Sequence, residues 1–108
     1  MQKIYNKLVR DRILEICQSR GAVTKYRRLN QKEFKKALIK KLIEEAKELE
    51  KAKNLLDLID EIADVHEVLL NIAKANKLKW SEIEKQRKVK NIKRGGFGKR
   101  HFLISISE

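Results

Sequence analysis

Two pairs of acidic side chains on neighbouring predicted helices are the residues best suited to chemistry. In the motif EEAKE, Glu45 and Glu48 lie three positions apart, with Glu44 beside them. In EIAD, Glu61 and Asp64 have the same spacing. Residues three or four apart share one helix face, with Cβ atoms roughly 5–6 Å apart. A hairpin of the two helices would therefore bring the two carboxylate pairs face to face.

These acids are set in apolar surroundings, which makes their charge costly. Glu45 shares a helix line with Leu42 and Leu49, and Glu61 lies four positions before Val65. Like charges at this spacing destabilise even an exposed helix by about 0.2–0.5 kcal/mol. Partial burial of an unpaired charge adds to that cost. A compensating group is therefore expected near the acids.

A divalent cation is the compensator that fits best. Protonation would require strongly raised pKa values for several carboxyl groups. Lysines are too few, because residues 44–67 hold nine acids and three lysines. Carboxylate oxygens are the ligands that Mg²⁺ or Mn²⁺ prefers. The alternative is an ordinary acidic face in contact with water. The pattern favours a metal site with four ligands: Glu45, Glu48, Glu61 and Asp64.

The charge of the chain leaves two other classes of function open. The net charge is +12 and the pI about 10.0, although the segment 44–67 is itself negative. Clustered lysines and arginines can bind the phosphates of nucleic acids and release counterions. The chain could therefore be a basic, helical nucleic-acid-binding module without catalytic activity. It could also be a bundle whose acids bind the basic face of another protein.

The hydrophobic pattern predicts a mainly all-α protein, an antiparallel bundle of about four helices. Helices are expected at 7–19, 31–52 and 55–76, followed by a shorter one from Ser81. The short joint near 51–54 should make the second and third helices an antiparallel hairpin. This hairpin carries all of the proposed metal ligands.

Two helix starts have the spacing of a capping box, in which a polar N-cap and an acid three residues later satisfy free backbone N–H groups. Asn30 with Glu33 marks the start of the second helix, and Ser81 with Glu84 marks that of the fourth. The segments 23–28 and 101–106 read as extended and could pair as a small two-stranded β element.

Length and composition predict a single domain over 1–108. No apolar run is long enough to cross a membrane, and no signal peptide is evident. The single Cys17 suits a reducing compartment, so a cytoplasmic location is expected. Because a chain of this length buries a limited core, a homo-oligomer, either a dimer or a tetramer, is expected.

Three segments in order resemble one known family. YNKLVRDRI (5–13), the pair of acidic motifs, and KRGGFGKRHFL (93–103) are similar to the MazG-like all-α nucleotide pyrophosphohydrolases, relatives of phosphoribosyl-ATP pyrophosphohydrolase. The resemblance covers nearly the whole chain. Relatives often have proline where this chain has Leu14, which affects the start of a helix and leaves the acidic motifs unchanged.

The resemblance implies a function that agrees with the chemistry of the acids. Family members hydrolyse nucleoside triphosphates between the α and β phosphates and release a monophosphate and pyrophosphate. The expected cofactor is Mg²⁺, with Mn²⁺ as an alternative, and nucleic acid is not required. Glu44 is the additional carboxylate of the motif, with a role in deprotonating water or in supporting the metal ligands. The base and sugar preferred are not specified by any motif.

Basic side chains near both ends of the chain are candidates for phosphate contacts. Those in the two terminal motifs are Lys7, Arg10, Arg12, Arg94, Lys99 and Arg100. Positions 10 and 12 cannot share a helix face, so one of these arginines is expected to pair with a nearby acid instead. The glycines of the C-terminal motif could let backbone approach a phosphate, or could simply form a turn.

Overall fold

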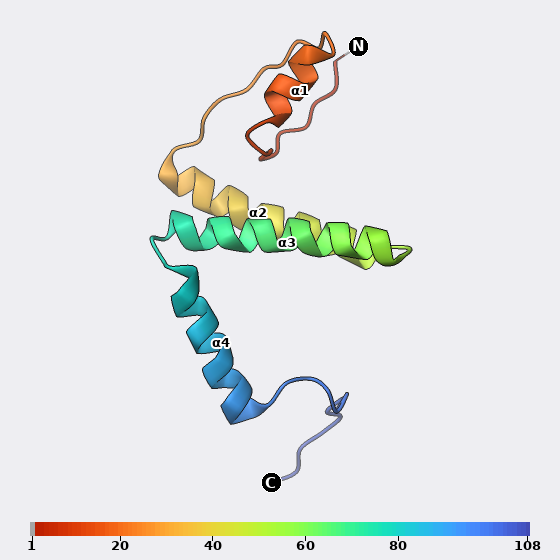
Figure 1. Ribbon diagram of the computed structural model, residues 1–108, viewed down its shortest axis with the longest axis vertical. Helices are drawn as coiled ribbons and strands as arrows, with labels where there is room; N and C mark the ends of the chain where they lie inside the picture. Colours follow the sequence, from red (N-terminus) through yellow and green to blue (C-terminus); the bar gives the residue numbers. More distant parts are fainter. Residues whose placement is uncertain (1) are drawn as a thin grey trace. The chain divides into compact units, whose positions relative to one another are not determined.

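The computed structural model describes residues 2–108, and the regular structure in that range consists of helices (Figure 1). The all-α class expected from the sequence is therefore confirmed. The segments 23–28 and 101–106 have no regular secondary structure, and no strand occurs within the described range. The four helices are α1 (Ile13–Ser19), α2 (Gln31–Glu50), α3 (Leu55–Ala75) and α4 (Trp80–Arg94).

The helices α2 and α3 lie side by side as an antiparallel hairpin (Figure 1). The joint between them covers only 51–54, and Asn54 caps α3 by accepting a hydrogen bond from the Asp57 N–H at 2.9 Å. Within residues 2–108 the buried hydrophobic side chains are Leu38, Val68 and Ala73, all on this hairpin. The hairpin is therefore the structural centre of its part of the chain.

The start of α2 has the capping box that its sequence predicts. The Asn30 side-chain oxygen accepts from the Glu33 N–H at 2.9 Å, and the Glu33 carboxylate accepts from the Asn30 N–H at 3.3 Å. Arg27 adds a hydrogen bond to Glu33 at 2.9 Å. The Arg27 hydrogen bond and the Asn30 N–H together lower the pKa of Glu33. These contacts fix where α2 begins.

The first helix is shorter than predicted, because it begins at Ile13 and not at position 7. The residues before it are not helical, and Asn6 has a φ of 45°. The apolar spacing is interrupted by the polar stretch Arg10–Arg12. Lys7 and Arg10 instead extend toward acids of the hairpin, and these contacts favour an open segment over another helical turn.

The start of α4 also differs from the prediction. The helix begins at Trp80, and it is Glu82 that accepts a hydrogen bond from the Lys79 N–H, at 3.3 Å. The capping box predicted from Ser81 and Glu84 is therefore wrong. Glu84 instead pairs with Arg87 at 2.6 Å, one helical turn further along the chain. Either Glu82 or Glu84 could have accepted a backbone hydrogen bond at the start of α4, and Glu82 is the one that does.

The described residues divide into two compact units, the first ending at Lys77 and the second covering Leu78–Glu108. The second contains α4, which is followed by Gly95 with a φ of 79°, a backbone conformation that glycine adopts without strain. No helix in residues 2–108 combines the length and the apolar character needed to cross a bilayer.

Candidate metal centre

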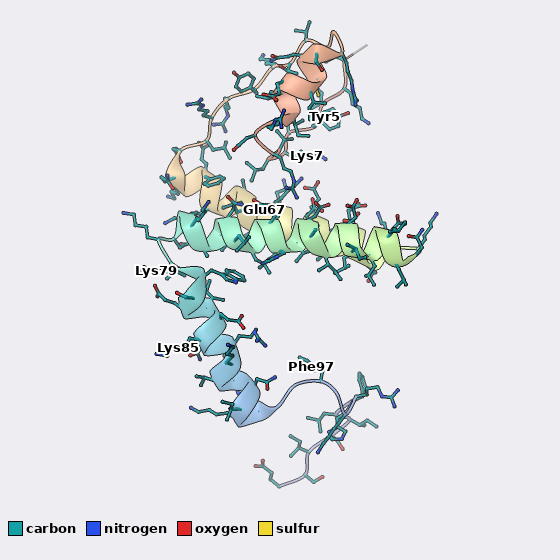
Figure 2. The ribbon with its side chains drawn as sticks, in the orientation of Figure 1. Tyr5, Lys7, Glu67, Lys79, Lys85 and Phe97 are labelled. Carbon is teal, nitrogen blue, oxygen red and sulfur yellow. The ribbon has the colours of Figure 1, made fainter. Side chains whose placement is uncertain are left out.

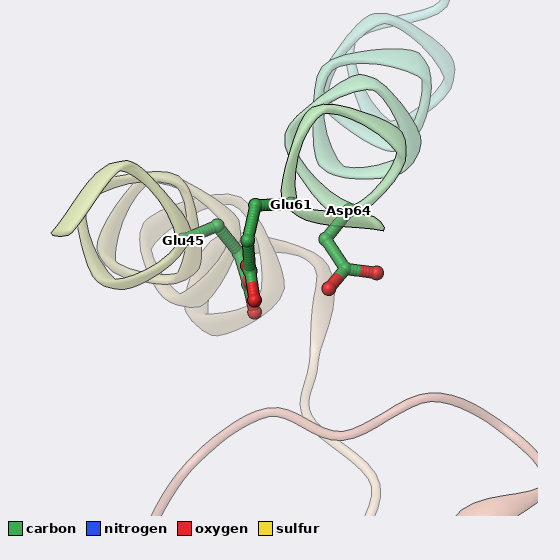
Figure 3. Close-up of side chains that lie close together, drawn as sticks. All are labelled: Glu45, Glu61 and Asp64. Carbon is green, nitrogen blue, oxygen red and sulfur yellow. The ribbon is translucent and has the colours of Figure 1, made fainter. Parts of the chain in front are cut away.

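Three carboxylates from the two helices of the hairpin converge on one point. Glu45 extends from α2, and Glu61 and Asp64 extend from α3, into the same space (Figure 3). One oxygen from each lies within 4.8 Å of the others. Ligand oxygens of an octahedral Mg²⁺ are roughly 3–4 Å apart, given metal–oxygen distances of 2.0–2.1 Å. A small contraction would let one cation contact all three.

Helical spacing explains why these side chains meet. Glu45 lies on the line of α2 that contains Leu42 and Leu49, and Glu61 lies on the line of α3 with Val65. Both lines are the ones expected to face the neighbouring helix, so the two glutamates occupy positions that apolar residues fill elsewhere in the hairpin. The Glu45 side chain is only 14% exposed.

Glu61 is the carboxylate that lacks compensation. Its Oε2 is shielded from water and has no hydrogen-bond partner. Burial is the largest cause of a raised pKa for Glu61, followed by the charges of Asp64 and Glu45 and then those of Glu48 and Asp60. Shielded carboxylate oxygens ordinarily have a partner, because an unpaired one is costly. The donor set and the unpartnered oxygen fit a hard divalent cation.

Glu44, in contrast, is compensated by the chain itself. Its Oε1 lies 3.4 Å from Lys7 Nζ and 3.5 Å from Lys41 Nζ. Partial burial opposes ionisation of this group, but the charge of Lys41 and the contacts with Lys7 outweigh it and lower its pKa. Glu44 therefore stays ionised beside the cluster, and it does not need a metal ion to do so.

The segment before α1 carries two of the predicted phosphate-binding residues to this site. Arg10 Nη2 lies 2.8 Å from Asp64 Oδ1, and Lys7 contacts Glu44. Lys7 Nζ also lies 5.6 Å from the centre of the Tyr5 ring, a cation–π distance (Figure 2). Arg12 turns away and pairs with Glu15 at 2.7 Å. Two cations are thus held next to the carboxylates.

The other predicted site residues are placed differently. Glu48 lies outside the cluster of three, with its side chain 51% exposed and 3.8 Å from Lys51 Nζ. It is still near enough for its charge to raise the pKa of Glu61. Arg94, Lys99 and Arg100 belong to the second unit of the chain, and their contact with phosphate stays a prediction.

Lys41 is a residue of the site that sequence reasoning missed. Its Nζ is 3.5 Å from both Glu44 and Glu45, and its side chain is only 17% exposed. The signal was present in the sequence, because Lys41 precedes these acids by three and four positions on one helix. The ammonium group of Lys41 therefore offsets part of the negative charge on α2. Lys41 forms no salt bridge with Glu61 on α3.

Comparison with protein-family models, with curated proteins and with solved structures finds no match for this chain. The chemical interpretation of the site is drawn from its own geometry: three converging carboxylates, one shielded oxygen without a partner, and two cations on an adjacent segment.

Proposed function

We propose that this chain is a Mg²⁺-dependent nucleoside triphosphate pyrophosphohydrolase. It would cleave an NTP or dNTP between the α and β phosphates and release the monophosphate and pyrophosphate. Such a hydrolase would clear unwanted nucleotides from the cytoplasmic pool. The observation that carries the proposal is the convergence of Glu45, Glu61 and Asp64, in which Glu61 also has a shielded oxygen without a hydrogen-bond partner.

The residues divide into groups with different tasks. Glu45, Glu61 and Asp64 would hold Mg²⁺ or Mn²⁺. When bound, such a cation polarises a phosphoryl oxygen and lowers the pKa of a coordinated water. Glu44 is ionised and adjacent, so its carboxylate is available to accept a proton or a hydrogen bond from the attacking water. Its role is supported by its charge state and by its position in the motif.

Lys7 and Arg10 are suited to the substrate's phosphates. Both are partly exposed, with side-chain exposures of 40% and 57%, and both already lie beside carboxylates of the site. Charge spreads over several oxygens when a phosphoryl group is transferred, so nearby cations stabilise the transition state. Resemblance of the three ordered motifs to the MazG-like enzymes favours the α–β bond over other phosphoryl bonds.

The proposal is tested by measuring pyrophosphate and monophosphate released from a panel of NTPs and dNTPs. Each reaction is run with Mg²⁺ and with EDTA, on the wild type and on Glu61→Ala. Glu67→Ala is the matched control, because Glu67 is on the same helix, exposed, and paired with Asn71 at 2.7 Å (Figure 2). Metal-dependent release that is lost in Glu61→Ala and kept in Glu67→Ala is expected. No cleavage of any nucleotide, together with thermal stability indifferent to Mg²⁺, would refute the proposal.

A second candidate function is nucleic-acid binding through α4. Exposed basic side chains occur along this helix, including Lys88, Lys93 and Lys85, the last of which is labelled in Figure 2. This alternative expects affinity for DNA or RNA that falls steeply with salt, because phosphate contacts release counterions. It also expects no effect of Glu61→Ala on that affinity. The acidic cluster plays no part in nucleic-acid binding, which is why hydrolysis of a nucleoside triphosphate is the preferred proposal.

A further inference from the structure

The segment before α1 reaches the hairpin with little apolar packing to hold it there. Residues 2–10 have no regular secondary structure. Two of the hydrophobic residues in this segment, Ile4 and Tyr5, are 66% and 61% exposed. Contacts between charged side chains therefore carry much of what keeps the segment in place. We call residues 2–10 the strap.

Two salt bridges join the strap to the hairpin, and they differ in what is left behind when they break. Lys7 Nζ lies 3.4 Å from Glu44 Oε1, but Lys41 Nζ lies 3.5 Å from the same oxygen. Glu44 would therefore keep an ammonium group beside it without Lys7. Arg10 Nη2 lies 2.8 Å from Asp64 Oδ1 and is the one salt-bridge partner of Asp64 among the described residues. The strap is thus tied to the candidate metal centre through Arg10.

Arg10 and a divalent cation would act on the same carboxylate. Asp64 is one of the three acids whose oxygens converge within 4.8 Å. The side chains of Arg10 and Asp64 are 57% and 37% exposed, and a salt bridge that is open to water contributes little stability. A divalent cation at Asp64 would attract the carboxylate with twice the charge and would repel the guanidinium group. The ion pair is therefore expected to break when a divalent cation binds.

Once it leaves Asp64, Arg10 has the right chemistry to bind phosphate. Its guanidinium group presents a planar fork of N–H donors that matches phosphate as well as carboxylate. Lys7 would still hold its end of the strap beside Glu44. Because three extended residues span roughly 10 Å, the backbone of Arg10 would stay within that distance of Lys7. The released arginine would therefore remain next to the carboxylates.

We infer that Arg10 is an exchangeable counter-ion: it neutralises Asp64 when no divalent cation is bound, and binding of the cation releases it toward the phosphates of the substrate. The inference rests on the proposed function and adds a form of regulation to it. A nucleotide that arrives before the metal ion meets an arginine already paired with Asp64. Productive binding of the nucleotide therefore requires that the metal ion is bound first or arrives with the nucleotide.

The alternative is a fixed role for Arg10 as a support of Asp64. A carboxylate has two oxygens, so Arg10 could hold Oδ1 while Oδ2 contacts the metal ion, and metal-ligating carboxylates are commonly hydrogen-bonded in this way. Loss of a fixed support would weaken the binding of metal, whereas loss of a competing cation would strengthen it. The direction of the change in metal affinity therefore separates the two roles.

The test is the binding of Mn²⁺ to the full chain without nucleotide, measured by isothermal titration calorimetry. Arg10→Gln removes the competing charge, so the dissociation constant for Mn²⁺ should fall about fivefold, which is the effect of losing one exposed salt bridge. Arg12→Gln is the matched control, because it removes the same charge from the same motif, whereas Arg12 pairs with Glu15 at 2.7 Å. This control should bind Mn²⁺ as the wild type does. Circular dichroism checks that both variants stay helical.

The release of the Arg10 side chain can also be observed directly. In NMR spectra of protein with isotope-labelled arginine, the side-chain N–H signal of Arg10 is identified by its absence from Arg10→Gln. Saturating Mg²⁺ should shift this signal to the position of an arginine in contact with water. Asp64→Asn should produce the same shift without Mg²⁺. The Arg12 signal should not move in either experiment.

Each outcome separates this inference from the proposed function. Mn²⁺ binding that is unchanged or weaker in Arg10→Gln, while the wild type binds Mn²⁺, overturns the inference and leaves the metal site in place. An Arg10 signal that does not move at saturating Mg²⁺ also overturns it. A wild type that binds no Mn²⁺ has no metal site, so the proposed function fails together with the inference.

Discussion

Glu44 and Glu61 are carboxylates of the same hairpin with opposite electrostatic environments. Both are intermediate in exposure, so burial alone does not separate them. Glu44 lies near the ammonium groups of Lys7 and Lys41, and its pKa is lowered. Glu61 has a shielded oxygen without a hydrogen-bond partner, and its pKa is raised. The chain places ammonium groups beside Glu44, whereas the charges nearest Glu61 are those of other carboxylates.

This difference assigns the two acids to different tasks. Glu44 already has two ammonium groups beside it, whereas an unpaired carboxylate oxygen among other carboxylates would gain the most from a metal ion. We therefore place Glu61 at the centre of the metal site and Glu44 beside it. Each prediction that follows changes one side of this comparison.

The largest effect is expected from removing the charge of Glu61 while keeping its shape. Glu61→Gln should lower kcat/KM for the cleaved nucleotide about thousandfold, the range seen when a main electrostatic contact to the transition state is lost. Glu44→Gln should lose only about hundredfold, because its proposed role is to act on the attacking water or to support the metal ligands. Steady-state pyrophosphate release measures both. Equal losses would mean that the two carboxylates do not have separate tasks.

The second prediction concerns thermal stability with and without metal. In EDTA at neutral pH, Glu61→Gln should raise Tm by a few degrees, because it removes repulsion from Asp64 and Glu45. The wild type should gain Tm as Mg²⁺ is added, by mass action on the folded state, and the variant should not. Glu44→Gln should lower Tm in EDTA and keep the gain with Mg²⁺. Differential scanning calorimetry distinguishes these outcomes, and a Mg²⁺ response retained in Glu61→Gln would contradict the assignment.

The third prediction follows from the opposite directions of the two pKa shifts. The folded state holds the proton of Glu61 more tightly than the unfolded state, since its pKa is raised. Without metal, the stability from this group is present below about pH 4.3 and is lost as pH rises through the raised pKa. Glu44 has a lowered pKa, so its contribution is present above about pH 4.3 and is lost as pH falls.

Profiles of Tm against pH in EDTA would show both effects. In Glu61→Gln, Tm should fall less steeply as the pH rises. In Glu44→Gln, Tm should fall less steeply as the pH is lowered. Arg27→Ala is a control away from the cluster, because it removes the hydrogen bond that lowers the pKa of Glu33 and should affect only the acid limb. A high-pH limb unchanged by Glu61→Gln would mean that this group does not carry the shift.

Local signals in the sequence were sufficient for the hairpin and for part of the candidate site. Asn30 and Glu33 fixed the start of α2, and the short joint 51–54 required two neighbouring antiparallel helices. Spacing of three placed Glu61 and Asp64 on one face. These features depend on contacts within a few residues, which helix geometry determines.

Features that depend on tertiary structure could not be predicted in the same way. The spacing of three residues predicts that Glu45 and Glu48 share one helix face. The rotation of α2 against α3, however, brings only Glu45 into the cluster and leaves the Glu48 side chain half exposed. The extended segment before Ile13 is stabilised by Lys7 and Arg10, whose acidic partners lie 37 and 54 residues away. No local periodicity contains information about such distant contacts.

The smallest effect is expected at the cations supplied by the chain. Lys7→Ala and Arg10→Ala should each raise KM about tenfold with a smaller change in kcat, because under the proposed function they would contact phosphates that are present in both the bound substrate and the transition state. Arg12→Ala is the matched control: Arg12 belongs to the same motif, but it pairs with Glu15 away from the cluster. Arg12→Ala should leave KM unchanged.

Lys7→Ala should also raise the pKa of Glu44 toward that of Glu61, because it removes one of the two ammonium groups that lower the pKa of Glu44. The measurement is the pH dependence of activity on its acidic side. If Lys7→Ala does not shift this part of the profile, then Lys41 alone sets the charge of Glu44, and Lys7 acts only on the substrate.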